Sequence, residues 1–302
     1  MSSAQKDCPA EEAALIAARP LNLPVALARF EQEASRGVFD TGRYRAAYYT
    51  WGTGPPLLFI HGLGDRAAAF APVISILAEH FRCIAYDQRS GSGDGARLSR
   101  ITHADLVDDA FALLDRLGVT QSYVLGSSFG STIALAAMHA CPERIPRGIL
   151  AGGFACRRLA WAEILLAQLG LYLPGPVRFL PLWRLVGQHN FGPQAKNRPE
   201  FLRYFLETTG TPLARSMAHR ALILHQIDLR PILSSIRQPV LMICGECDQV
   251  VPQRCEGPLL EGLPNVGRVE LSGCGHFAHY SHPEVMAEVI RRFLTPPACP
   301  AQ

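Results

Sequence analysis

At positions 123–130 the chain reads Tyr-Val-Leu-Gly-Ser-Ser-Phe-Gly, a short apolar run that leads into the pattern G-x-S-x-G with Ser128 at its centre. The apolar run predicts a buried strand, and the residues after Gly130 predict a helix. A strand that turns directly into a helix strains the backbone of the middle residue, and flanking glycines remove side chains that would collide there. Such a turn presents the Ser128 hydroxyl at the carboxyl end of a parallel sheet, where open α/β sheets bind ligands. Ser128 is therefore the candidate nucleophile, with a turn that carries no chemistry as the alternative.

A serine hydroxyl is a poor nucleophile at neutral pH, so Ser128 needs a base to accept its proton and a third group to orient that base. Both residue types occur in the last third of the chain. Asp248 lies in the loop after the apolar run 240–244, and His276 lies in the loop after the run 269–271. The sequence thus predicts a catalytic triad of Ser128, Asp248 and His276.

Other residues near these positions compete for the same roles. Glu246 also follows the strand at 240–244 but comes two residues earlier than Asp248, and Asp87 ends a different predicted strand. Ser127 is adjacent to Ser128 but off the apex of the turn. We therefore keep Asp248 as the acid and Ser128 as the nucleophile.

Strands and helices alternate along the chain on both sides of the strand-to-helix turn at Ser128, which we call the elbow. This alternation is typical of an α/β fold, in which a mostly parallel sheet has helices on both faces. A capping box at Thr102 and Asp105 begins one helix, which is expected to end at Gly118. Strands are expected at 57–60, 82–87, 122–126, 147–153, 239–245 and 267–271, a hairpin at 35–40 and 43–51, and helices at 66–80, 129–141, near Glu256 and at 284–294.

The alternation is interrupted between the strand at 147–153 and the strand at 239–245. We read residues 157–235 as an insertion, residues 35–156 and 236–302 as the α/β core, and residues 1–34 as a helical N-terminal arm. The insertion is rich in aromatic residues and leucines. It also holds ten Lys and Arg against four Asp and Glu, an excess of positive charge that is either a solvated outer face or an attraction for an anionic substrate or a membrane surface.

Composition excludes several classes of protein. Of 302 residues, 48% are hydrophobic and 18% charged, which argues against a disordered chain. A net charge of +3 without a dense basic block gives no reason to expect nucleic-acid binding. The longest apolar stretch, 159–173, is interrupted by Glu163 and Gln168 and is too short to span a bilayer.

The cysteines point to a reducing compartment. There are nine, an odd number, and the N-terminus lacks the basic start and apolar run of a secretory signal, so free thiols and a cytoplasmic location are expected. Cys244 and Cys247 fit C-x-x-C, a spacing that occurs in redox and zinc sites. Because Cys244 closes an apolar run, we expect a packed core cysteine rather than thiol chemistry.

Besides the G-x-S-x-G turn, the chain has His61-Gly-Leu-Gly64 after a strand, Asp87-Gln-Arg89 followed by glycines, G-x-x-D-x-x-x-P at 245–252, and Gly275-His276. Together these motifs resemble the α/β-hydrolase superfamily, over nearly all of residues 35–294. One departure concerns the loop after Asp87, where the family usually has D-x-R-G-x-G and this chain reads Asp87-Gln-Arg-Ser-Gly-Ser-Gly93, with one apparent extra residue. No predicted triad residue lies in that loop.

Attack on a carbonyl needs donors for the oxygen that becomes negatively charged. The backbone N–H of Phe129, at the start of the helix after Ser128, is expected to be one such donor. The resemblance implies a second, the backbone N–H of Leu63, and we expect both side chains to line the pocket. It also implies that the insertion is a helical lid over Ser128 and that His61 holds backbone rather than moving protons. With nucleophile, base and oxyanion donors assigned, no metal or other cofactor is expected.

His279 and His282 follow His276 at intervals of three residues and suggest a metal site, but the chain shows no further ligands that would converge there. We expect both to flank the start of the last helix.

The favoured function is hydrolysis of a small-molecule carboxylic ester with an apolar acyl or alcohol group, through an acyl-enzyme on Ser128. Related enzymes that resemble this chain cleave carbon–carbon bonds in dienoic keto acids, but these often carry Trp after the catalytic histidine where this chain has Phe277. Acyl transfer to an alcohol uses the same intermediate and stays open. Dehalogenase and epoxide hydrolase chemistry needs a carboxylate nucleophile, which Ser128 argues against. A binding protein without catalysis is the alternative outside enzymes; such proteins normally lose a triad residue, and all three are present here.

Overall fold

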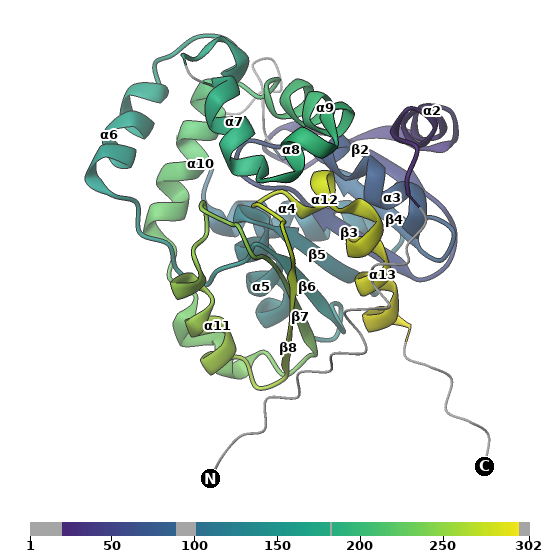
Figure 1. Ribbon diagram of the computed structural model, residues 1–302. Helices are drawn as coiled ribbons and strands as arrows, with labels where there is room; N and C mark the ends of the chain where they lie inside the picture. The colour runs from purple at the N-terminus through teal and green to yellow at the C-terminus, as the bar shows by residue number, and fades with distance from the viewer. Residues whose placement is uncertain (1–19, 89–100, 182, 296–302) are drawn as a thin grey trace, which may run out of the picture.

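An eight-stranded sheet runs through the centre of the computed structural model, which describes residues 20–88, 101–181 and 183–295 (Figure 1). The spatial order of the strands is β1-β2-β4-β3-β5-β6-β7-β8. β2 is antiparallel to β1 and to β4, and the other neighbouring strands are parallel. The expected α/β fold is confirmed. The strands are β1 (Ser35–Asp40), β2 (Arg45–Trp51), β3 (Pro56–Ile60), β4 (Arg82–Tyr86), β5 (Tyr123–Ser127), β6 (Gly148–Ala151), β7 (Val240–Gly245) and β8 (Val266–Leu271).

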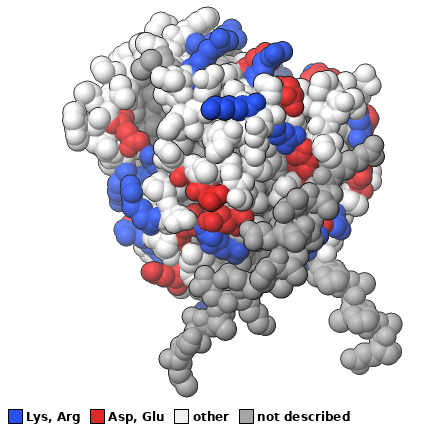
Figure 2. Space-filling model, in the orientation of Figure 1, with Lys and Arg blue, Asp and Glu red and all other residues white. Residues whose placement is uncertain are grey.

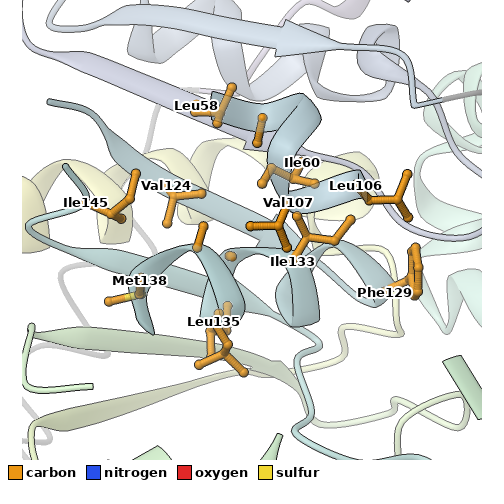
Figure 3. Close-up of a cluster of buried hydrophobic side chains, with 14 of the residues drawn as sticks. Leu58, Ile60, Leu106, Val107, Val124, Phe129, Ile133, Leu135, Met138 and Ile145 are labelled. Carbon is orange, nitrogen blue, oxygen red and sulfur yellow. The ribbon is translucent and has the colours of Figure 1, made fainter. Parts of the chain in front are cut away.

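Helices cover both faces of this sheet, and alternate residues of each central strand point to opposite faces. In β3, Leu58 and Ile60 pack with the cluster under α4 (His103–Arg116) and α5 (Phe129–Ala140). Leu57 and Phe59 pack with the cluster under α3 (Ala71–Leu77) and α13 (Pro283–Leu294). Figure 3 shows the first cluster, in which Leu58, Val124 and Ile133 lie between the sheet and α5. The core helices are α2 (Leu23–Glu33), α3 (Ala71–Leu77), α4 (His103–Arg116), α5 (Phe129–Ala140), α11 (Gly257–Gly262), α12 (Ala278–Ser281) and α13 (Pro283–Leu294).

The helix expected at 66–80 differs from the prediction. Residues Ala67–Phe70 form a 3₁₀ turn, and the α-helix α3 begins only at Ala71. Pro72 explains the boundary, because proline has no N–H to donate and fits only the first turn of an α-helix. The glycine-rich loop expected after β4, including the departure from the family pattern, falls on residues 89–100 and lies outside the described residues.

Local signals set the ends of α4 as the sequence predicts. Thr102 accepts a hydrogen bond from the Asp105 N–H, and the Asp105 carboxylate accepts one from the Thr102 N–H, which makes a reciprocal capping box. The helix stops before Gly118, whose φ of +66° is a left-handed conformation that glycine adopts without strain.

The helix α2 packs on the core. Phe30 is 3% exposed and lies beside the rings of Tyr49 and Trp51, at centroid distances of 5.2 and 6.0 Å. The backbone N–H of Leu21 donates to the carboxylate of Glu284 in α13 at 2.7 Å. Residues 20–34 of the expected arm are therefore joined to the sheet face that carries α3 and α13, and residues 1–19 lie outside the described residues.

Residues 157–235 separate β6 from β7 in the chain, and we call them the cap segment. In Figure 1 its helices lie above the sheet, with α6 at the outer edge and α10 between α6 and the sheet. None of the helices in the described ranges is both long and apolar enough to cross a membrane. The helices of the cap segment are α6 (Trp161–Gly170), α7 (Trp183–Phe191), α8 (Gln194–Asn197), α9 (Pro199–Thr209) and α10 (Ala214–Gln226).

Candidate active site

Ser128 occupies a sharp turn between β5 and α5. Its φ of +51° is the only left-handed value among the non-glycine residues that the structure describes, so its backbone is strained. A side chain at Gly126 would place its Cβ 2.4 Å from the Gly130 carbonyl oxygen, and one at Gly130 would come within 2.1 Å of the Ile60 oxygen. The two glycines therefore allow β3, β5 and α5 to approach closely enough for this turn, as the G-x-S-x-G pattern predicts.

Asp248 and His276 lie in direct contact, although 28 residues separate them in the chain. The Oδ2 atom of Asp248 is 2.7 Å from Nδ1 of His276, and the two side chains are 6% and 3% exposed. The other oxygen, Oδ1, accepts hydrogen bonds from the backbone N–H groups of Val250 and Val251 at 2.8 and 2.9 Å. Because an ionised carboxylate only accepts, Nδ1 of His276 carries the proton and Nε2 is left with a lone pair.

The loop that carries His276 is fixed from two sides. The backbone N–H of His276 donates to the carbonyl oxygen of Asn190 in α7 at 3.1 Å. At Gly152, just after β6, a Cβ would be 3.0 Å from Nδ1 and Cε1 of the imidazole and 3.4 Å from Oδ2 of Asp248. Gly152 therefore leaves the room that the Asp248–His276 pair needs, and α7 connects the cap segment to the histidine.

Ser128 and His276 line one pocket, together with Leu63 from the loop after β3. Its cavity volume is about 150 Å³, and most of its lining is apolar. The cap segment contributes side chains from three helices, and its Asn190 and Thr209 are the polar residues among them. The lining residues from the cap segment are Trp183, Val186, Gly187, Asn190, Phe205, Thr209 and Met217.

The two expected oxyanion donors come from different elements of the fold. Leu63 lines the pocket, and Phe129 is the first residue of α5, where the backbone N–H groups have no partner within the helix. The expectation that the Phe129 side chain also lines the pocket was wrong. Phe129 is fully buried against α4, with its ring 6.3 Å from that of His103, because the first helical turn directs it into the core.

The competing acids are engaged elsewhere. The carboxylate of Glu246 accepts hydrogen bonds from the hydroxyl of Ser272 and the backbone N–H of Gly273, which lower the pKa of this exposed group. Asp87 accepts a hydrogen bond from the N–H of Ala67 at 2.7 Å and lies 3.5 Å from the guanidinium of Arg66. Neither acid contacts the His276 ring.

His61 holds two loops together. Its Nδ1–H donates to the Gly62 carbonyl oxygen at 2.9 Å, and its Nε2 accepts from the backbone N–H of Gln88 at 3.0 Å. Burial, together with the positive charge of Arg220, lowers the pKa of the His61 imidazole to about 4. The ring is neutral at pH 7 and fixes the Gly62–Leu63 backbone beside the elbow.

His279 lies in α12 and bonds to an acid that the sequence reasoning missed. Its Nε2 is 3.0 Å from Oδ2 of Asp65, and the hydroxyl of Tyr280 donates to Oδ1 of Asp65 at 2.8 Å. Asp65 is 3% exposed and lines the pocket. His282 precedes α13 as expected. No group of three His, Cys, Asp or Glu that could hold a metal ion occurs within the described ranges.

Sequence reasoning also passed over Gly152 and Asn190. The only local signals were Gly152-Gly153 after a predicted strand and Asp65 directly after the His-Gly-Leu-Gly motif. Cys244, by contrast, is a core residue of β7, and burial raises the pKa of its thiol to about 12.

Comparison with known proteins agrees with the resemblance seen in the sequence. Residues 55–283 match the family model described as alpha/beta hydrolase fold. The chain is similar to a pimeloyl-[acyl-carrier protein] methyl ester esterase from a Shewanella species, at 30% identity over 81% of this chain and 92% of that protein. It is also similar to a 2-hydroxymuconate semialdehyde hydrolase from Pseudomonas putida, at 26% identity over 87% and 94%. A solved hydrolase from Pseudomonas aeruginosa superposes with a TM-score of 0.77 at 22% identity, over 86% of this chain and 98% of that one.

Proposed function

The chain belongs to the α/β-hydrolase fold family, and on that premise we propose that it is a serine hydrolase that cleaves a carboxylic ester with an apolar acyl or alcohol group. One arrangement carries the proposal: a strained Ser128 and a hydrogen-bonded Asp248–His276 pair at one pocket. In this proposal Ser128 is the nucleophile, His276 the base, and Asp248 the group that orients the imidazole and stabilises its charge.

In the acylation half of the reaction, Oγ of Ser128 attacks the ester carbonyl carbon and its proton passes to Nε2 of His276. The carbonyl oxygen becomes negatively charged and accepts hydrogen bonds from the backbone N–H groups of Leu63 and Phe129. When the tetrahedral intermediate collapses, the C–O bond to the alcohol breaks, and His276 returns the proton to the departing oxygen.

In the second half, water attacks the acyl-enzyme. His276 takes a proton from the water and gives it to Oγ of Ser128 as the acid leaves. The triad residues and the two backbone donors account for each proton and electron pair in this cycle. Transfer of the acyl group to an alcohol would follow the same steps with the alcohol in place of water.

The pocket supports an apolar substrate group of modest size. Drug-sized ligands occupy pockets of roughly 300–1,000 Å³, whereas this cavity measures about 150 Å³. We therefore propose a small-molecule ester as the substrate, the cap segment as a lid that supplies the apolar wall, and the cytoplasm as the location. The Shewanella relative is named as a methyl ester esterase, which agrees with ester chemistry.

A series of nitrophenyl esters of increasing acyl length tests this proposal. Each methylene that the pocket desolvates adds up to about 0.8 kcal/mol of transition-state binding. We expect kcat/KM to rise from acetate to butyrate or hexanoate and then to fall once the cavity is full. Ser128→Ala should abolish turnover of every ester, and Ser131→Ala, which removes a hydroxyl one turn further along α5, should retain most of it.

A second part of this experiment uses an ester with a carboxylate on its acyl chain, assayed at low and high salt. A flat neutral series together with salt-sensitive turnover of the anionic ester would contradict the apolar pocket and would favour an acidic substrate. Turnover of a dienoic keto acid but of no ester would favour carbon–carbon cleavage on the same triad.

A further inference from the structure

The outer side of α6 exposes a continuous set of large apolar side chains. Trp161 is 79% exposed, Leu166 68%, Leu169 57% and Tyr172 86%, with Leu165 between them. Successive residues of an α-helix are about 100° apart, so Trp161, Leu165, Leu166 and Leu169 occupy one arc of α6, and Tyr172 lies in the turn directly after the helix. We call this arc, formed by Trp161, Leu165, Leu166, Leu169 and Tyr172, the apolar arc.

The opposite side of α6 is already packed. Ala167 and Gly170 are buried there, and a Cβ at Gly170 would be 2.9 Å from Cβ of Ala218 in α10. The one acid of this helix, Glu163, is half-buried and bonds Arg157 at 3.0 Å. The apolar arc therefore contains no charged residue. In Figure 2 the surface over α6, at the upper left, is largely white.

The elements that follow α6 expose further large apolar side chains. Phe179, in the 3₁₀ turn Val177–Phe179, is 72% exposed, and Leu185 of α7 is 62% exposed. Contiguous apolar patches of this kind are rare on monomeric soluble proteins and mark surfaces that bind another molecule or a membrane.

Basic side chains accompany these residues. The guanidinium of Arg178 lies 5.3 Å from the ring centre of Phe179, and Arg184 precedes Leu185. Both arginines are exposed, and neither forms an ion pair with a residue that the structure describes. Exposed Trp, Tyr, Phe and Leu beside unpaired Arg is the composition of a helix that lies in the headgroup region of a bilayer.

The charges distinguish between two occupants of this surface, a second copy of the chain and a lipid bilayer. In a symmetric dimer the same patch of each molecule would face the other, so two surfaces that each carry Arg178 and Arg184 would bring like charges together. An anionic bilayer instead attracts these side chains and receives the apolar arc at the depth of its acyl chains. We propose that the apolar arc and Arg178 and Arg184 form a docking surface for an anionic phospholipid bilayer.

This surface reaches the mouth of the pocket. Val186 of α7 is 50% exposed and also lines the cavity that contains Ser128. A protein docked through α6 and α7 therefore presents its pocket to apolar molecules dissolved in the bilayer. The docking itself does not involve Ser128 or His276, so vesicle binding can be tested whether or not the protein hydrolyses esters.

Co-sedimentation of the full chain with phosphatidylcholine vesicles, with and without phosphatidylglycerol, tests the proposal. We expect binding to vesicles that contain phosphatidylglycerol and much weaker binding to those without it. Leu166→Ser with Leu169→Ser should lower the partition coefficient at least tenfold, because removing one leucine from an apolar environment alone changes an equilibrium roughly tenfold. Arg178→Glu with Arg184→Glu should remove the preference for the anionic vesicles.

The matched control replaces two exposed apolar residues outside the cap segment, Val25→Ser with Leu260→Ser, and should leave vesicle binding unchanged. Thermal melting establishes that all variants are folded. The proposal is overturned if the wild type does not bind vesicles, or if the control pair weakens binding as much as the leucine pair. It is also overturned if sedimentation velocity shows a dimer that only the leucine pair disrupts, while vesicles bind nothing.

Discussion

Asp248 uses its two carboxylate oxygens for different tasks. Oδ1 accepts from two consecutive backbone N–H groups, which fixes the carboxylate in its loop, and Oδ2 faces the imidazole of His276. This division matters because a carboxylate that is free to rotate would not hold the imidazole in one orientation. The neutral ring then has its proton on Nδ1 and its lone pair on Nε2.

Replacing Asp248 by Asn should therefore preserve the fold but impair the base. An amide can donate to Nδ1 and so favours the wrong tautomer of His276, and we expect kcat to fall by up to about 10⁴-fold, as in other triads. Glu246→Gln, in the same loop but bonded to Ser272 and Gly273, is the control and should keep its activity. If Glu246→Gln were the crippling change, the assignment of the acid would be wrong. Nitrophenyl butyrate turnover and a thermal melt are the measurements.

The buried His61 predicts how stability depends on pH. Its pKa is lowered to about 4 in the folded protein, from about 6.5 in the unfolded chain. Between these values the unfolded state binds more protons, so the free energy of unfolding falls as the pH drops from about 6.5 towards 4. At pH 5 the loss from this one group is about 2 kcal/mol.

Urea unfolding at pH 7 and pH 5 measures this effect. The variant His61→Gln is less stable at pH 7 because it loses the bonds to Gly62 and Gln88, but its stability should fall less steeply towards pH 5. His103, whose pKa burial also lowers to about 4, retains its own contribution in both proteins. Equal slopes in the two proteins would mean that His61 is not buried as a neutral ring.

At the scale of elements, α2 shows a packing role that its sequence alone did not reveal. The sequence predicted residues 1–34 as a helical arm without an assigned role, since the partners of α2 lie far away in the chain. Phe30 meets β2 residues, and the N–H of Leu21 meets Glu284, 263 positions later. Glu284 also bonds Arg198 of the cap segment at 2.6 Å, so α2, α13 and the cap segment share one carboxylate.

Phe30→Ala should accordingly destabilise the whole chain. Removing a fully packed aromatic side chain costs about 3 kcal/mol or more, and we expect chemical denaturation to show a loss of that size. Val25 lies in the same helix but is 54% exposed. Val25→Ala should therefore change the free energy of unfolding by less than about 0.5 kcal/mol. Similar effects of the two changes would show that α2 is only loosely attached.

The elements predicted best were those with a signal within a few residues. Apolar runs located the strands, the capping box located the start of α4, and the glycines around Ser128 located the elbow. What the sequence missed depends on distant contacts. Gly152 matters because His276 lies over it, and Asp65 because α12 covers it. Phe129 turned into the core because α4 packs there, which no pattern around Ser128 contains.

On the scale of the whole molecule, the sheet brings the candidate residues together. Ser128, Asp248 and His276 follow β5, β7 and β8, which are parallel members of one sheet. Parallel strands end at the same edge, so three loops far apart in the chain meet there. β6 lies between β5 and β7, and Gly152 at its end keeps the space open. The cap segment then covers this edge and supplies most of the apolar wall.

The most direct test of this account is to locate the covalent bond that the reaction is proposed to form. A fluorophosphonate reacts with a serine only when that serine is activated as a nucleophile, and peptide mass spectrometry identifies the modified residue. We predict one equivalent of adduct on Ser128, loss of esterase activity in proportion to labelling, and no adduct in Ser128→Ala. Labelling that persists in Ser128→Ala, or an adduct on Ser127 in the wild type, would contradict the account.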